Sequence, residues 1–303
     1  MTSGSGKERE RTREKGASAT VALVVIALVI IAIAVMVLLS RSNESAKPSP
    51  GASAGSSAKP SAMPTGPVLS DAVMQDIVGV PAAALDAAGA GGNDVRPPDR
   101  LPDDPPALTS DGKPEVFYVG AGFCPYCAAE RWPLVQALSR FGKFSNLGAS
   151  QSGPAPEAYP NTQTVTFYGS SYTSPYVAFA PVEMADTAGN PLQQLTPEQQ
   201  RVFDTYNAPP YAPKGSAGAI PFLDIGGVYV GAGASFGVEL LQGMSIEEIA
   251  ASMSDPSSRA GQSIDASANL LTAAICETTG NQPADVCSTP AVKAAAQRLA
   301  TGS

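Results

Sequence analysis

The chain contains one continuous apolar stretch long enough to cross a lipid bilayer, and this stretch separates regions of different composition. Residues 21–39 include no polar side chain. As a helix they would span about 28 Å, close to the hydrocarbon thickness of about 30 Å. The apolar part of a cleaved signal peptide is shorter, about 7–15 residues, so cleavage is the weaker alternative. We predict a transmembrane helix over residues 21–40.

The flanking charges predict the orientation of this helix. Five basic residues precede it, whereas three follow it within residues 41–66. By the positive-inside rule, residues 1–20 form a cytoplasmic tail, and the remainder lies outside the cytoplasm. Of the 26 residues from 41 to 66, 19 are Ser, Ala, Pro or Gly, a composition that predicts a disordered linker. The expected protein is a single-pass protein of the cell membrane with an exported domain over 67–303.

The charge and histidine content exclude several classes of function. The net charge is -8, so the chain lacks the basic surface with which proteins bind nucleic acids. It contains no histidine, which excludes Ser-His-Asp triads and histidine-ligated zinc sites. Chemistry must therefore come from cysteine, carboxylate, tyrosine or lysine side chains, and we expect neither a cofactor nor a metal.

The exported region reads as an α/β domain. Apolar and capping patterns predict a helical segment interrupted at Pro81, a buried strand, a long helix, and then further strands and helices. The predicted helices are 69–85, 124–141, 196–206, 265–278 and 290–300, and the predicted strands are 116–119, 165–168, 176–182, 220–224 and 227–230.

The most informative motif is Cys124-Pro-Tyr-Cys127, which lies between the buried strand and the long helix. Haem attachment needs a following histidine, and the ten-residue gap between Cys276 and Cys287 is unlike a zinc knuckle, which makes zinc a weak alternative. A thiol at the start of a helix faces unpaired N–H groups that stabilise its thiolate. We therefore predict a redox dithiol, with Cys124 as the nucleophile and Cys127 as the resolving thiol.

The chain contains the blocks FCPYCAAERW, TFYGSSYTSPYVAF, IPFLDIGGVYV and AAIC followed by QPADVC. These four blocks resemble an uncharacterised family of membrane-anchored thioredoxin-like proteins. The resemblance implies a thioredoxin-like fold with an insertion, at about residues 150–212, between the Cys-x-x-Cys helix and the strand after Pro221. It also implies that the Ile220-Pro221 bond is cis and that Ile220 offers its backbone to an extended substrate. An ordinary trans proline at a strand edge is the alternative.

One position departs from the thioredoxin pattern. Thioredoxins tend to have a buried acid six residues before the first cysteine, and Tyr118 stands there in this chain. Glu130, three residues after Cys127 on the same helix face, is the predicted substitute as proton acceptor. The alternative is that Glu130 and Arg131 form a solvated ion pair. The only tryptophan, Trp132, is predicted to lie in the core.

The second cysteine pair has two interpretations. Cys276 and Cys287 fall in the two C-terminal helical regions, where a disulfide would join them and stabilise the domain by roughly 2–3 kcal/mol. A relay that exchanges electrons with Cys124 and Cys127 is the alternative. Nothing in the neighbouring sequence is typical of an activated thiol, so the structural disulfide is preferred.

Together these features predict a thiol–disulfide oxidoreductase that acts on exported or membrane protein thiols. Its Pro-Tyr dipeptide resembles the pattern of glutaredoxins and bacterial disulfide oxidants, and this resemblance implies a reduction potential of roughly -230 to -120 mV. A membrane redox partner would recycle the dithiol, and the bilayer contacts the protein through residues 21–40. The alternative is a non-catalytic binding or scaffold module in which both cysteine pairs are permanent disulfides.

Overall fold

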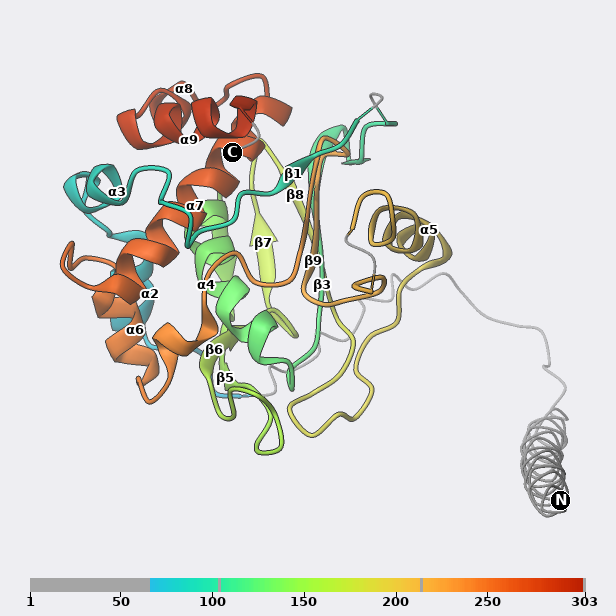
Figure 1. Ribbon diagram of the computed structural model, residues 1–303, viewed down its shortest axis with the longest axis vertical. Helices are drawn as coiled ribbons and strands as arrows, with labels where there is room; N and C mark the ends of the chain where they lie inside the picture. Colours follow the sequence, from blue (N-terminus) through green and yellow to red (C-terminus); the bar gives the residue numbers. More distant parts are fainter. Residues whose placement is uncertain (1–65, 103–104, 213–214, 302–303) are drawn as a thin grey trace, which may run out of the picture. The chain divides into compact units, whose positions relative to one another are not determined.

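The computed structural model describes residues 66–102, 105–212 and 215–301 (Figure 1). The predicted tail, transmembrane helix and nearly all of the linker therefore lie outside the described residues. The strands are β1 (Asp99–Arg100), β2 (Thr109–Ser110), β3 (Lys113–Gly120), β4 (Lys143–Ser145), β5 (Gly148–Gln151), β6 (Gln163–Thr166), β7 (Ser171–Thr173), β8 (Ala178–Glu183), β9 (Phe222–Ile225) and β10 (Tyr229–Ala232). The helices are α2 (Asp71–Val78), α3 (Ala82–Ala88), α4 (Pro125–Ser139), α5 (Pro197–Tyr206), α6 (Ile246–Ser252), α7 (Arg259–Thr278), α8 (Ala284–Cys287) and α9 (Pro290–Thr301), with a 3₁₀ turn, η1, at Val238–Leu241.

The central sheet mixes parallel and antiparallel pairs. Its strands run in the order β1-β10-β9-β3-β2, and β8 also pairs with β3. The β3–β8 pair is parallel, whereas β9 is antiparallel to both β3 and β10. The domain is thus a mixed α/β structure, in agreement with the predicted fold class at this level.

Both faces of β3 are buried, which explains its continuous apolar run. Val116 and Tyr118 pack into the cluster that includes α4 and α7. Phe117 and Val119, on the opposite face, pack into a second cluster with residues of α5. Figure 1 shows the resulting layers, with α4 and α7 on one side of the sheet and α5 on the other.

Local capping signals in the sequence correspond to observed helix starts. Ser70 caps α2 by accepting a hydrogen bond from Val73 N, and Pro81 separates α2 from α3. Thr196 caps α5 through a capping box with Gln199. Trp132 is fully buried, as predicted, and its indole N–H donates to Gln163 O at 3.1 Å.

The region between α4 and β9 is more than a peripheral insertion. Two small sheets, β4-β7 and β5-β6, lie outside the central sheet. The predicted insertion at 150–212 also includes β8 and α5, but β8 pairs with β3 in the central sheet and α5 covers one face of it. The elements that stand apart from the sheet therefore fall within residues 143–173.

The structure also contains elements that the sequence did not predict. These are the short strands β1, β2, β4, β5 and β7 and the helices α6 and α8. None of the helices in the described part of the chain is long and apolar enough to span a membrane.

Candidate functional site

The site is assembled where three central strands meet at one edge of the sheet. β3 ends at Gly120, which pairs with Glu183 at the end of the parallel strand β8. Val119 pairs with Phe222, the first residue of β9. Because β9 runs in the opposite direction, the segment entering β9 lies beside the segment leaving β3. This register brings distant parts of the sequence to the cysteine motif.

Cys124 is the N-cap residue of α4, the position predicted for the nucleophile. Its sulfur accepts a hydrogen bond from Cys127 N at 3.2 Å, and Pro125 occupies the first turn of the helix. Cys124 keeps 6% of its surface exposed, whereas Cys127 is fully covered. Both thiols are free in this structure. Both cysteines are therefore buried, and Cys124 is the less deeply buried of the two.

The two thiols have opposite acidities. The pKa of Cys124 is lowered, first by a hydrogen bond with the Cys127 side chain and further by the Cys127 N–H and by Arg131, which together outweigh burial. Burial raises the pKa of Cys127 well above its ordinary value, and the interaction with Cys124 raises it further. The pair therefore favours a thiolate on Cys124 and a proton on Cys127.

The segment before β9 lies directly against Cys124. Cys124 Sγ is 3.6 Å from Ile220 O, and the Ile220-Pro221 peptide bond is cis, as predicted. Asn207, immediately after α5, donates from Nδ2 to Ala219 O at 2.8 Å. The predicted positioning residues Ile220 and Pro221 are thus brought together with the dithiol, and Asn207 holds the preceding peptide.

Glu130 is buried in the same helix as the dithiol. Its Oε2 accepts hydrogen bonds from Ser235 N at 2.8 Å and Ser235 Oγ at 2.7 Å. Burial raises the pKa of Glu130 to about 7. These hydrogen bonds orient one carboxylate oxygen toward the loop after β10. The role of Glu130 as proton acceptor for Cys127 stays a prediction.

Arg131 does not form a solvated ion pair with Glu130, which was the alternative interpretation of the sequence. Both side chains are buried, and Arg131 forms a two-pronged ion pair with Glu183 through contacts of 2.8 and 2.7 Å. Glu183 was missed by sequence reasoning. The available signal was its position directly after a predicted strand, since parallel strands end at the same edge of a sheet.

Tyr118, which stands where thioredoxins have an acid, lies beneath the same site. The Arg131 guanidinium carbon is 5.9 Å from the centre of the Tyr118 ring. Burial raises the pKa of Tyr118 well above its ordinary value, so the phenol stays protonated at neutral pH. Gly120 makes room for this phenol, because a Cβ at that position would overlap the Tyr118 hydroxyl.

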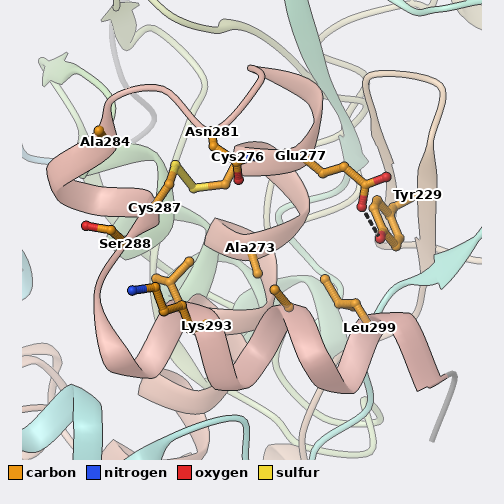
Figure 2. A pocket seen from close by; sticks show the side chains of 12 residues that line it. Tyr229, Ala273, Cys276, Glu277, Asn281, Ala284, Cys287, Ser288, Lys293 and Leu299 are labelled. Carbon is orange, nitrogen blue, oxygen red and sulfur yellow. Dashed lines mark hydrogen bonds between the residues drawn. A yellow bond between two sulfur atoms is a disulfide. The ribbon is translucent and has the colours of Figure 1, made fainter.

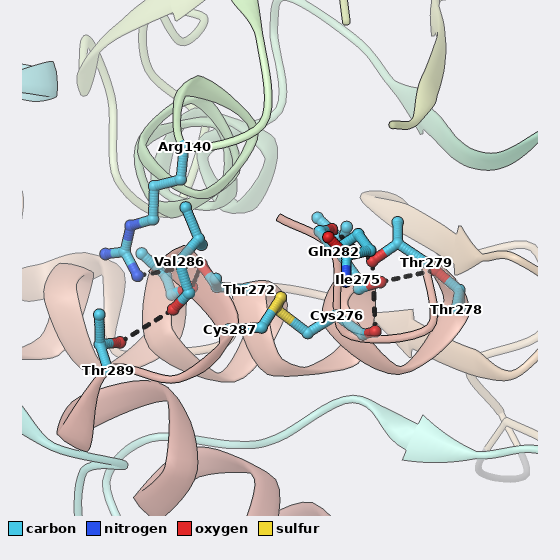
Figure 3. The surroundings of a disulfide bond; sticks show 11 residues. Arg140, Thr272, Ile275, Cys276, Thr278, Thr279, Gln282, Val286, Cys287 and Thr289 are labelled. Carbon is cyan, nitrogen blue, oxygen red and sulfur yellow. Dashed lines mark hydrogen bonds between the residues drawn. A yellow bond between two sulfur atoms is a disulfide. The ribbon is translucent and has the colours of Figure 1, made fainter. Parts of the chain in front are cut away.

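The second cysteine pair is a disulfide distant from this edge. Cys276, near the end of α7, is bonded to Cys287 in α8, and the neighbouring Thr279 hydroxyl bonds to the loop between them (Figure 3). A cavity of about 500 Å³ lies beside the bond (Figure 2). At one end of this cavity, the Glu277 carboxylate accepts hydrogen bonds from Tyr229 and Arg100.

The disulfide also bears on the zinc alternative. Because Cys276 and Cys287 are bonded to each other, they do not complete a four-cysteine site with Cys124 and Cys127. Across residues 66–301, apart from the two short gaps, no group of three or more acidic or cysteine side chains is arranged to hold a metal ion.

Comparison with known families assigns residues 103–277 to a domain of unknown function, DUF929. The chain belongs to the DUF929 family. The DUF929 match includes Cys124 and Cys127, the Ile220-Pro221 segment and Cys276, and it ends before Cys287. The predicted membership in an uncharacterised family is confirmed, while the family description names no activity. No curated protein and no solved structure matches the chain significantly.

Proposed function

We propose that this DUF929 protein catalyses thiol–disulfide exchange through Cys124 and Cys127. The observation that carries the proposal is the position of Cys124 at the start of α4. There its sulfur accepts the Cys127 N–H and lies 3.6 Å from the Ile220 carbonyl oxygen. A thiol with a lowered pKa next to a fully buried thiol with a raised pKa is the arrangement that stepwise exchange requires.

The surrounding sheet supports a thioredoxin-like assignment. The parallel β3–β8 pair, the antiparallel β9 and β10, and helices on both faces are compatible with a thioredoxin-like fold. In this interpretation, the backbone near Ile220 and Pro221 pairs with an extended substrate segment, which places a substrate sulfur near Cys124.

In the reducing direction, the exchange proceeds in two displacement steps. The Cys124 thiolate attacks one sulfur of a substrate disulfide, which breaks that bond, forms a mixed disulfide and releases the other substrate sulfur as a thiolate. Cys127 then loses its proton, and Glu130 is the predicted acceptor. The Cys127 thiolate attacks Cys124 Sγ, which forms the Cys124–Cys127 disulfide and releases the second substrate thiol.

A substrate-turnover assay tests the proposal. The full chain in detergent should reduce insulin or reshuffle scrambled ribonuclease, and Cys124→Ser should abolish both activities. The double variant Cys276→Ala/Cys287→Ala is the matched control, because it removes two cysteines but leaves the dithiol. Inactivity of the unmodified protein, with a Cys124–Cys127 potential below about -300 mV, would instead support the scaffold alternative.

We further propose that residues 21–40 anchor this activity in the membrane with the domain outside the cytoplasm. The support is the length of the apolar run and the excess of basic residues before it. A reporter that works only outside the cell should be active when fused after residue 66. A reporter active only in the cytoplasm would reverse the proposed orientation.

A further inference from the structure

A buried cation lies beneath the dithiol and is linked to it through one backbone carbonyl. Arg131 Nη2 donates to Ala121 O at 2.9 Å, and Cys124 N contacts the same oxygen at 3.3 Å. The Arg131 side chain is only 1% exposed. Its charge is therefore poorly screened by solvent and acts on groups within the same low-dielectric region.

The counter-ion contacts the same guanidinium nitrogen, because Arg131 Nη2 donates to both Ala121 O and Glu183 Oε2. Glu183 occupies the end of β8, and both of its oxygens contact Arg131 nitrogens. Within the described residues, Arg131 Nη1 and the Tyr118 hydroxyl are buried without a hydrogen-bond partner. The cation is thus held in place by Glu183 and Ala121, while two polar groups near the sulfurs keep unused hydrogen-bonding capacity.

This arrangement favours one redox state of the cysteine pair. Besides the larger effect of the Cys127 hydrogen bond, the guanidinium charge lowers the pKa of Cys124. Burial raises the pKa of Cys127, and the same guanidinium opposes that rise. A thiolate gains energy from a neighbouring cation, but a disulfide carries no charge and gains almost nothing. A cation at this position therefore stabilises the reduced pair relative to the oxidised pair.

A role in folding alone does not account well for this ion pair. Removing two charges from water costs several kcal/mol per ion, so a buried ion pair of this kind is weak evidence for stability. A pair of apolar side chains would fill the same volume without that cost. The guanidinium charge lowers the pKa of both thiols, so the dithiol is a functional group on which the charge acts.

We propose that Arg131, oriented by Glu183, stabilises the reduced Cys124 thiolate, so that the Cys124–Cys127 disulfide accepts electrons from substrate dithiols. The inference rests on the proposed exchange activity and adds its direction. A substrate thiolate attacks Cys124 Sγ, the Cys124–Cys127 bond breaks, and Cys127 leaves and takes up a proton. A second substrate thiolate then attacks the substrate sulfur of the mixed disulfide, and Cys124 leaves as the stabilised thiolate. The substrate loses two electrons and gains a disulfide, while the protein pair gains two electrons.

Three variants of the full chain separate the charge effect from packing. Arg131→Met/Glu183→Met removes both charges without leaving one unpaired. Glu183→Gln keeps the cation but removes its counter-ion. Arg140→Met is the matched control, because Arg140 is a partly buried arginine at the end of the same helix that bonds to Asn269 and Thr272 instead.

Two measurements read the effect. The first is the pH dependence of iodoacetamide alkylation at Cys124, which reports thiolate formation. The second is the equilibrium between the dithiol and glutathione. In the double variant, the alkylation midpoint should rise, and the equilibrium should shift several-fold toward the disulfide. Glu183→Gln should shift both in the opposite direction, and Arg140→Met should shift neither.

The outcomes distinguish this inference from the proposed function. Unchanged midpoints and equilibria in the double variant and in Glu183→Gln would overturn the role of Arg131, even if exchange persists. If the double variant does not fold, the sign of the Glu183→Gln shift decides the same question. A wild-type disulfide that glutathione fails to reduce would overturn the direction. If wild-type protein oxidises no substrate dithiol but the alkylation shifts occur, the exchange activity fails and the electrostatic role stands.

Discussion

The two cysteine pairs of this chain occupy opposite ends of helices. Cys124 caps the N-terminus of α4, whereas Cys276 lies two residues before the end of α7. The positive end of a helix dipole stabilises a thiolate and the negative end disfavours one. Cys124 and Cys127 are free thiols in the structure, and Cys276 and Cys287 form a disulfide. We therefore expect helix position and nearby charge, more than the presence of paired cysteines, to set the redox behaviour of each pair.

The strongest test of this contrast is loss of one sulfur from the first pair. Cys124→Ser should reduce exchange by at least about a hundredfold, because a neutral hydroxyl is a far weaker nucleophile than a thiolate. Cys127→Ser should instead accumulate mixed disulfides with substrates, since the resolving thiol is missing. Mass spectrometry of trapped adducts checks the second expectation. Equal adduct formation by both variants would contradict the assigned roles.

The second pair should affect stability instead of exchange. Cys276→Ala/Cys287→Ala should lower the free energy of unfolding by roughly 2–3 kcal/mol, because the closed loop constrains the unfolded chain. Denaturant unfolding measures this change, and the exchange rate should stay within about twofold of wild type. A large loss of exchange in a folded double variant would revive the relay interpretation.

Glu130 offers a test of proton handling at the first pair. Its pKa is raised by burial to about 7, so its contribution to stability is present below pH 4.5 and is lost as the pH rises toward 7. Glu130→Gln should therefore flatten the stability profile over this range, by roughly 2 kcal/mol.

The same variant should slow resolution of mixed disulfides several-fold if the carboxylate accepts the Cys127 proton. Denaturant unfolding at several pH values and rapid-quench measurement of resolution provide the two readings. A flattened stability profile with unchanged resolution would remove Glu130 from the exchange reaction.

The smallest expected effect concerns the peptide that lies against Cys124. Asn207→Ala removes the hydrogen bond to Ala219 O and should cost about 1 kcal/mol of stability. It should also raise the KM for a peptide disulfide, while the alkylation profile of Cys124 stays unchanged. Gln200→Ala, at an exposed position on α5, is the matched control. A shifted alkylation profile in Asn207→Ala would show that this contact acts on the thiol itself.

Much of the central architecture was predictable from local sequence signals. The apolar run at 116–119 predicts a strand buried on both faces, and Thr196 with Gln199 marks the start of α5. The Cys-x-x-Cys spacing predicts that Cys124 begins a helix and that Cys127 is covered. These features depend on residues close in sequence, which is why single-sequence reasoning reaches them.

The residues that contact the dithiol from other strands depend on long-range pairing, and they were harder to predict from the sequence. Glu183 reaches Arg131 across 52 residues, and only the parallel register of β3 and β8 brings them together. Glu130 and Arg131 look like a solvated charge pair in the sequence, because nothing local indicates that both faces of α4 are covered. Short strands such as β4 and β7 lack a strong alternating pattern and were missed for the same reason.

The pairing of Gly120 with Glu183 makes this site sensitive to insertions and deletions in β8. Side chains alternate between the two faces of a strand, so the loss of one residue upstream would move Met184 into the place opposite Arg131. The carboxylate would then point toward the aromatic cluster under α5, and the guanidinium would lose its counter-ion. Insertions or deletions in the connection before β8 should be tolerated only if they preserve the β3–β8 register. Substitutions in that connection leave the register unchanged.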